Sequence, residues 1–140
     1  MKYLSEVRIL SDEKLATLRR LVEAVGSGDV QAALAELDPD VEIDDTDIPD
    51  ADDYRGHDAF LAWVSTWDES WASWRVEDLA VRSAGNTEAV ALFKMIVTGK
   101  GSGIELDRND AVVATLRDDK IVKLGYYNDQ GKALAAAGLG

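Results

Sequence analysis

Residues 89–127, AVALFKMIVTGKGSGIELDRNDAVVATLRDDKIVKLGYY, decide the fold class because they read as three consecutive strands. Residues 89–97 are almost continuously apolar, and a second strand pattern, residues 104–116, follows a glycine-rich connection. The run Arg117-Asp118-Asp119-Lys120 is typical of a tight hairpin turn, after which residues 121–127 form the last strand. The order predicts an antiparallel meander.

Before the meander, the sequence predicts two more strands and three helices, the latter from apolar residues at helical spacing. A strand from Trp74 to Val81 precedes the meander, and another short alternating strand covers residues 41–44. Three helices are predicted around that short strand, and each follows a residue suited to cap a helix: Ser11 before residues 12–25, Asp29 before residues 30–37 (closed by Pro39), and Asp58 before residues 60–71.

The resulting order is α-α-β-α-β-β-β-β, followed by a short tail helix over residues 132–137. Helices gathered on one face of a mainly antiparallel sheet make an α+β fold. We expect one domain over residues 1–140, with an N-terminal extension at 1–10 and a tail at 132–140. A strongly bent sheet over three helices should leave a conical pocket of the kind that small ligands use.

Composition excludes several classes of function. The 15 basic and 27 acidic side chains give a net charge of −12, which disfavours nucleic acid and anionic membrane surfaces as partners. There is no cysteine, and no apolar run approaches the roughly 18 residues of a membrane span. We expect a cytoplasmic protein that needs no metal and no cofactor.

Six short segments resemble, in the correct order, the SnoaL-like polyketide cyclases of the nuclear-transport-factor-2-like class. For example, Tyr54-Arg55-Gly56-His57-Asp58 resembles the family's "YRGHE" start of the third helix. The full set is Gly28–Leu34, Asp38–Glu42, Tyr54–Asp58, Gly101–Glu105, Thr115–Val122 and Tyr127–Leu139. This resemblance implies the same pocketed fold, but the fold hosts enzymes and non-catalytic binders alike.

The resemblance also allows two known chemistries to be compared with this chain. At the positions of the ketosteroid-isomerase tyrosine and oxyanion Asp the chain has Leu21 and Val112, so steroid isomerisation is disfavoured. The SnoaL-type cyclases place a general acid/base near the end of the last strand, where this chain has Asn128-Asp129. Their partner histidine has no counterpart here, because Val112 and Ala114 occupy that region.

Three residues are candidates for catalysis. Asp129 matches the cyclase acid/base, although its alternative role is to cap the tail helix. His57 is the only histidine and could act as a base or orient a ligand, or else bond loop backbone. Asp44 and Asp45 follow the first strand, and alternation turns Asp45 toward the pocket if the apolar face lines it.

Aromatic residues dominate the expected ligand-binding set. Four tryptophans lie within twelve residues, and Trp63 and Trp67 share one helical face, which indicates core packing or a wall for a planar ligand. The remaining members of the set are Tyr54, Tyr126, Asn128, Val112 and Ala114. The polar residues at 108–110 are interpreted as a solvent-facing or dimer-facing bulge.

The stretch from Asp38 to Asp53 holds nine carboxylates in sixteen residues. A calcium site is the alternative interpretation, but the spacing of the carboxylates does not match an EF-hand, so a solvated acidic loop over the pocket entrance is favoured.

Two functions remain open. The first is cofactor-free acid/base chemistry on a small hydrophobic carbonyl compound, and the second is non-catalytic binding of such a ligand. A homodimer is also expected.

Overall fold

The structure is a computed structural model that describes residues 11–45 and 54–139, apart from the side chain of Tyr54. Its helices and strands follow the predicted order, with one additional short strand, β2. In chain order the elements are α2 (Asp12–Ser27), α3 (Val30–Ala35), β1 (Leu37–Asp45), β2 (Tyr54–Arg55), α4 (His57–Ser70), β3 (Trp71–Ala84), β4 (Glu88–Gly99), β5 (Glu105–Arg117), β6 (Lys120–Tyr127) and α5 (Gln130–Ala136).

The strands form one mixed sheet in the order β2-β1-β6-β5-β4-β3. Neighbours from β3 to β6 are antiparallel, as the meander predicts, whereas β1 pairs with β6 in parallel. The hairpin between β5 and β6 turns at Asp118 and Asp119, which both have positive φ. This geometry suits a two-residue hairpin because it matches the twist of the flanking strands.

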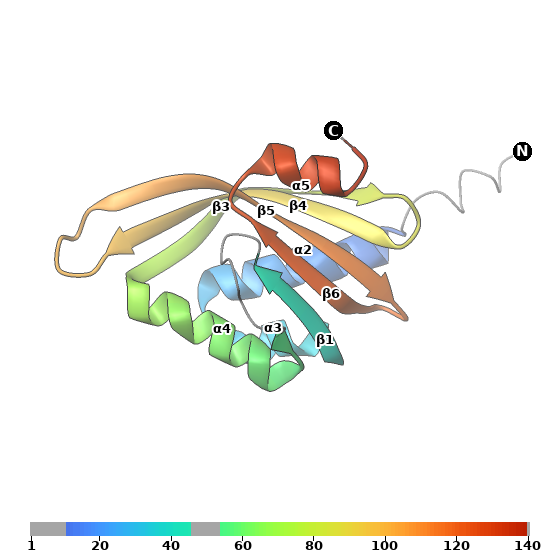
Figure 1. Ribbon diagram of the computed structural model, residues 1–140, viewed down its shortest axis with the longest axis horizontal. Helices are drawn as coiled ribbons and strands as arrows, with labels where there is room; N and C mark the ends of the chain where they lie inside the picture. The colour runs from blue at the N-terminus through green and yellow to red at the C-terminus, as the bar shows by residue number, and fades with distance from the viewer. Residues whose placement is uncertain (1–10, 46–53, 140) are drawn as a thin grey trace, which may run out of the picture.

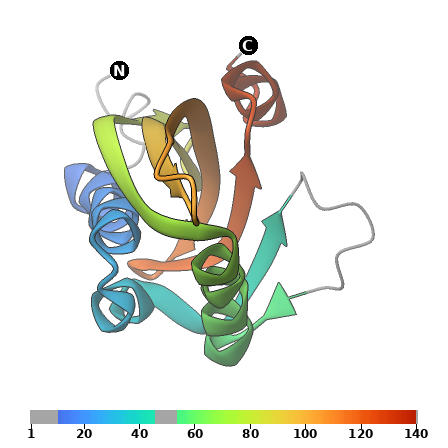
Figure 2. The ribbon, with the colours of Figure 1, turned by 90° about the vertical axis from the view of Figure 1, so that its left-hand side faces the viewer.

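The sheet curls around three helices. Helices α2, α3 and α4 lie inside the curve (Figure 2), whereas α5 lies against the opposite face of β4, β5 and β6 (Figure 1). The buried hydrophobic core joins the inner face of the sheet to α2 and α4 through residues such as Leu18, Phe60 and Phe93. The predicted α+β fold is therefore confirmed.

The helix boundaries confirm two of the three predicted caps. Ser11 Oγ accepts a hydrogen bond from the Lys14 amide at 3.2 Å, and Asp29 Oδ1 accepts one from the Ala32 amide at 3.1 Å. Asp58 is not a cap, because α4 begins at His57 after Gly56, whose φ of 91° favours glycine. No helix in the described residues is long and apolar enough to span a membrane.

Two boundaries were predicted too far along the chain. Helix α3 ends at Ala35 rather than near Pro39, because Leu37 already belongs to β1 and Glu36 O accepts a hydrogen bond from the Ile121 amide at 3.0 Å. Similarly, Trp71 is the first residue of β3 rather than the end of a helical stripe. At the end of α3, the hydrogen bond to Ile121 of β6 stops the helix earlier than the apolar spacing predicts. At the end of α4, the backbone of Trp71 is already extended, although its spacing fits the helical stripe.

Candidate functional site

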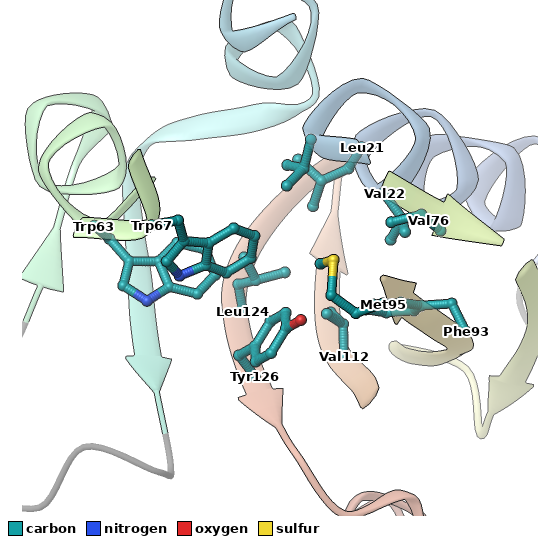
Figure 3. Close-up of a pocket in the computed structure, with 11 residues that line it drawn as sticks. Leu21, Val22, Trp63, Trp67, Val76, Phe93, Met95, Val112, Leu124 and Tyr126 are labelled. Carbon is teal, nitrogen blue, oxygen red and sulfur yellow. The ribbon is translucent and has the colours of Figure 1, made fainter. Parts of the chain in front are cut away.

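Two cavities adjoin one another between α4 and the inner face of the sheet. The inner cavity is about 20 Å³ and wholly apolar, lined by Leu21, Val22, Val25, Trp63, Trp67, Val76, Phe93, Met95, Val112, Leu124 and Tyr126 (Figure 3). The outer cavity is about 140 Å³ and mixes aromatic with polar groups. Its lining is Asp45, Trp67, Trp71, Trp74, Met95, Val97, Arg108, Tyr126 and Asn128.

Three side chains belong to both linings and therefore separate the two spaces. Trp67 approaches from α4, while Met95 and Tyr126 come from β4 and β6 of the sheet (Figure 3). The inner space has room for about one water molecule and offers it no polar group, which makes it a packing defect of the core rather than a ligand site. The outer cavity is accordingly the candidate site.

An aromatic cluster builds one wall of the outer cavity. The ring of Trp67 contacts Trp63, Trp74 and Tyr126 edge to face, with ring centroids 4.9, 5.6 and 5.4 Å apart. The indole N–H of Trp74 donates to the Val25 carbonyl at 2.9 Å, which fixes that ring across the space between α2 and β3. Such packing gives a rigid wall suited to a flat apolar ligand.

A polar triad links two strands beside this wall. Tyr126 Oη donates a hydrogen bond of 2.6 Å to Asp110 Oδ2, and Arg108 Nη2 lies 3.0 Å from the same oxygen. The Asp110 side chain is 0% exposed, whereas the Arg108 side chain is 37% exposed and lines the outer cavity. A buried carboxylate needs such partners, because losing them would leave an uncompensated charge.

The electrostatics of the triad follow from its burial. Burial raises the pKa of Tyr126 well above its usual range, and the negative charge of Asp110 and the hydrogen bond to it act in the same direction. Burial lowers the pKa of Arg108, but the charges of Asp110 and Tyr126 and the hydrogen bonds to both residues together outweigh burial, so the pKa is raised. Tyr126 is therefore a neutral donor and Arg108 a permanent cation at neutral pH.

A second carboxylate, Asp45, lies at the end of β1. It is buried, it lines the outer cavity, and its Oδ2 accepts a hydrogen bond of 2.9 Å from Trp63 Nε1. Alternation along β1 explains this placement, since Val41, Ile43 and Asp45 are buried while Asp44 is exposed. The parallel register sets Asp45 opposite Tyr126 of β6.

The structure brings six of the residues singled out from the sequence to the two cavities. Asp45 and Asn128 line the outer cavity, Trp63 and Val112 line the inner one, and Trp67 and Tyr126 line both. These residues come from β1, α4, β5, the end of β6 and the residue after it. The site is thus assembled from segments that lie far apart in the sequence.

The other four candidates lie elsewhere. Asp129 is exposed and its Oδ1 accepts a hydrogen bond from the Lys132 amide at 3.1 Å, so it caps α5. His57 Nε2 lies 3.0 Å from the Leu37 carbonyl at the start of α4. Ala114 is buried in the core without lining either cavity, and Tyr54 begins β2 with its side chain outside the described part.

Sequence reasoning missed Arg108 and Asp110. The sequence pattern favours a solvent-facing or dimer-facing bulge at these residues, yet β5 pairs with β4 without a register shift from Glu88↔Thr115 to Thr98↔Glu105. Alternation was the available indication, since Arg108 and Asp110 share the inner face with Val112. The acidic loop at residues 46–53 lies outside the described residues, and among those described no group of three or more His, Cys, Asp or Glu side chains could hold a metal ion.

Comparison with known protein families adds a decisive match. The model of the SnoaL-like domain matches residues 18–124, which is most of the chain and includes every strand up to the middle of β6. This chain belongs to the SnoaL-like family. A comparison of the SnoaL-like chain with curated proteins found no match.

Solved structures share the fold of this SnoaL-like protein. A candidate polyketide cyclase of Xanthomonas campestris superposes with a TM-score of 0.72 at 19% identity, covering 89% of this chain and 96% of the other. A nuclear-transport-factor-2-like protein of unknown function from Burkholderia pseudomallei gives 0.70 at 20% identity, covering 89% and 97%. TerC, co-crystallised with polyporic acid, gives 0.71 at 13% identity, covering 91% and 99%. At these identities the likeness concerns the fold.

Proposed function

We propose that this SnoaL-like protein binds a small hydrophobic carbonyl compound in its outer cavity and acts on it by cofactor-independent acid/base chemistry. The observation that carries the proposal is the placement of Asp45, a buried carboxylate, on the wall of a cavity that tryptophans line. The same cavity presents the Arg108 guanidinium. A proton acceptor and a cationic hydrogen-bond donor on the wall of one cavity are the groups that enolisation requires.

In the proposed step the Asp45 carboxylate takes a proton from the carbon next to the carbonyl group. The C–H electron pair becomes the C=C bond of the enolate, and the negative charge moves to the carbonyl oxygen. In an isomerisation, Asp45 returns the proton to another carbon of the delocalised enolate. In a ring closure, the enolate carbon attacks a second carbonyl, the C=O π electrons move to its oxygen, and that alkoxide takes the proton back from Asp45. The indole N–H of Trp63 keeps the carboxylate in place through its hydrogen bond of 2.9 Å.

The size of the cavity supports a ligand with one buried ring. A volume of about 140 Å³ is close to the ~150 Å³ that holds a benzene molecule in a protein interior. It is smaller than the roughly 300 Å³ or more of typical drug-sized sites. Co-crystallisation of the fold neighbour TerC with polyporic acid supports the use of this fold for small organic ligands.

The test is hydrogen exchange of a model ketone. Acetophenone is incubated in D₂O with the purified protein, and loss of the methyl proton signal is followed by NMR. We expect faster exchange than in buffer alone, and a decrease of about 100-fold or more for Asp45→Asn. Asp44→Asn is the matched control, because Asp44 is the exposed neighbour on the same strand and should exchange as the wild type does.

The exchange assay also separates this proposal from the assignment made on sequence grounds. If Asp129→Asn abolishes exchange while Asp45→Asn does not, then the acid/base group lies at the end of β6. Exchange that persists in both variants would contradict both assignments.

The second candidate function is non-catalytic binding. It is favoured by the hydrogen bond that already occupies Asp45, and by the positions of Asp129 and His57 away from both cavities. Acetophenone would then bind, as saturation-transfer NMR detects, but would exchange no faster than with Asp45→Asn. We also retain the homodimer as a proposal, which a monomeric mass in light scattering at micromolar concentration would remove.

A further inference from the structure

The Arg108 side chain is held in one orientation at the edge of the outer cavity. Its Nη2 is bound to Asp110, whose own carboxylate is fully buried and held by Tyr126. Because the guanidinium is planar and rigid, fixing one terminal nitrogen fixes the direction of the remaining N–H groups. The Arg108 side chain lines the outer cavity and is 37% exposed.

The hydrogen-bonding capacity of Arg108 is incompletely used within the described part of the chain. Arg108 Nη2 donates to Asp110, and Arg108 also interacts with Tyr126, while Arg108 Nε is buried with no acceptor in the described residues. A buried donor without a partner is uncommon in proteins and is often explained by function. A ligand oxygen at the edge of the cavity would give this cation a further acceptor.

Charge limits the kind of acceptor. Asp45 lines the same cavity, Asp110 lies directly beneath Arg108, and the whole chain carries a net charge of −12. Among the described residues, one cation lies beside two carboxylates, so these three side chains together carry a net negative charge. A carboxylate ligand would be repelled there, whereas a neutral carbonyl oxygen can accept a hydrogen bond at no such cost.

We infer that Arg108 is the residue that binds the ligand oxygen, that this oxygen belongs to a neutral ketone or aldehyde, and that Asp110 and Tyr126 are positioning residues for Arg108. The inference rests on the proposed function and names the recognition group of the same site. It also places a permanent cation where negative charge develops on the oxygen during enolisation, so that Arg108 stabilises the enolate that Asp45 creates.

The experiment compares three single-ring probes of similar size, namely acetophenone, ethylbenzene and benzoate, by ligand-detected NMR titration. We expect the wild type to bind acetophenone more tightly than ethylbenzene and more tightly than benzoate. Arg108→Leu should weaken acetophenone about tenfold or more, since a hydrogen bond from a charged donor is lost, and leave ethylbenzene within about twofold. Asp110→Asn should show the same selective loss for acetophenone, which a general loosening of the core would not produce.

Controls keep the result interpretable. Arg75→Leu removes an exposed arginine of β3 that pairs with Glu77 and Glu105 away from the cavity, and it should leave all three affinities unchanged. Should Arg108→Leu fail to fold, Arg108→Lys decides the matter, because lysine keeps the charge but not the planar fork. Arg108→Lys should then bind acetophenone more weakly than the wild type does and leave the affinity for ethylbenzene unchanged.

The outcomes are distinct. Binding of acetophenone that survives Arg108→Leu, or equal weakening of acetophenone and ethylbenzene, overturns the role of Arg108 but leaves the proposed function standing. Tighter binding of benzoate than of acetophenone overturns the neutral-oxygen assignment. Absence of binding by all three probes overturns this inference and the proposed function together.

Discussion

The hydroxyl of Tyr126 on β6 donates a 2.6 Å hydrogen bond to the carboxylate of Asp110 on β5, and both side chains are buried. The register explains the meeting, because Tyr126 pairs with Val112, two residues beyond Asp110 on the same face of β5. A buried charge thus lies beside the cavity in a sheet whose inner face is otherwise largely apolar. The effect of this buried charge on stability and its effect on ligand binding can be measured separately.

Removing the hydroxyl should destabilise the protein. Tyr126→Phe leaves Asp110 with one donor fewer in a buried position, so we expect the free energy of unfolding to fall by about 1–3 kcal/mol. Urea unfolding followed by tryptophan fluorescence measures the change. Tyr127→Phe is the matched control, because Tyr127 is only partly buried on the other face of β6, and it should change stability by less than about 0.5 kcal/mol. Equal effects of the two variants would contradict the prediction.

Stability should also fall at high pH because of the same tyrosine. The pKa of Tyr126 is raised in the folded protein above its ordinary value of 10.0. The unfolded chain therefore releases this proton first, and stability present below pH 10 is lost as the pH rises toward the folded pKa. Urea unfolding at pH 8, 10 and 11 should show a steeper decline for the wild type than for Tyr126→Phe. Parallel declines would mean that other groups control the alkaline transition.

The hydrogen bond between Trp63 and Asp45 should appear as a coupling energy. A double-mutant cycle with Trp63→Phe and Asp45→Asn should give about 1–3 kcal/mol, because the buried carboxylate loses its indole donor in the first variant. Trp67→Phe combined with Asp45→Asn serves as the comparison cycle, since Trp67 lies one turn later on α4 in the same aromatic cluster. Additivity in both cycles, within about 0.5 kcal/mol, would show that the Trp63 contact contributes nothing specific.

Met95 should set the upper size of the ligand. It separates the cavities of about 140 and 20 Å³ together with Trp67 and Tyr126. Met95→Ala joins them, so we expect 2-acetylnaphthalene to gain affinity relative to acetophenone, at a loss of about 2–5 kcal/mol in stability. Ile96→Ala removes a buried side chain from the opposite face of β4 and should change stability without changing that ratio. An unchanged ratio in Met95→Ala would mean that the ligand does not reach the partition.

Local chemistry explains which parts of the fold the sequence reveals. Ser11 and Asp29 cap the helices they precede, and Asp118-Asp119 forms the turn of the last hairpin, because these effects depend on neighbours within a few residues. The predicted end of α3 was wrong because the actual end depends on Ile121, which pairs with Leu37 and is distant in the sequence. Hydrophobic spacing carries no information about such a partner.

The site residues also divide into those that local sequence reveals and those that depend on distant partners. Alternation along β1 is enough to turn Asp45 inward, and helical spacing is enough to place Trp63 and Trp67 together. The importance of Asp110 depends on Tyr126 across the sheet and on Arg108 two residues earlier, and a polar triplet inside a strand looks like a surface feature until that register is known. Asp129 illustrates the reverse case, because one carboxylate type serves both helix capping and acid/base chemistry.

The parallel pairing of β1 with β6 has a consequence for how the protein is made. Hairpins from β3 to β6 join neighbours in the sequence, but Asp45 meets Tyr126 only when most of the chain has been enclosed in one loop. Such distant contacts are entropically costly and form slowly. A nascent chain therefore lacks its cavity until residues 120–127 have left the ribosome, so the proposed binding of acetophenone would report that the last strand has docked.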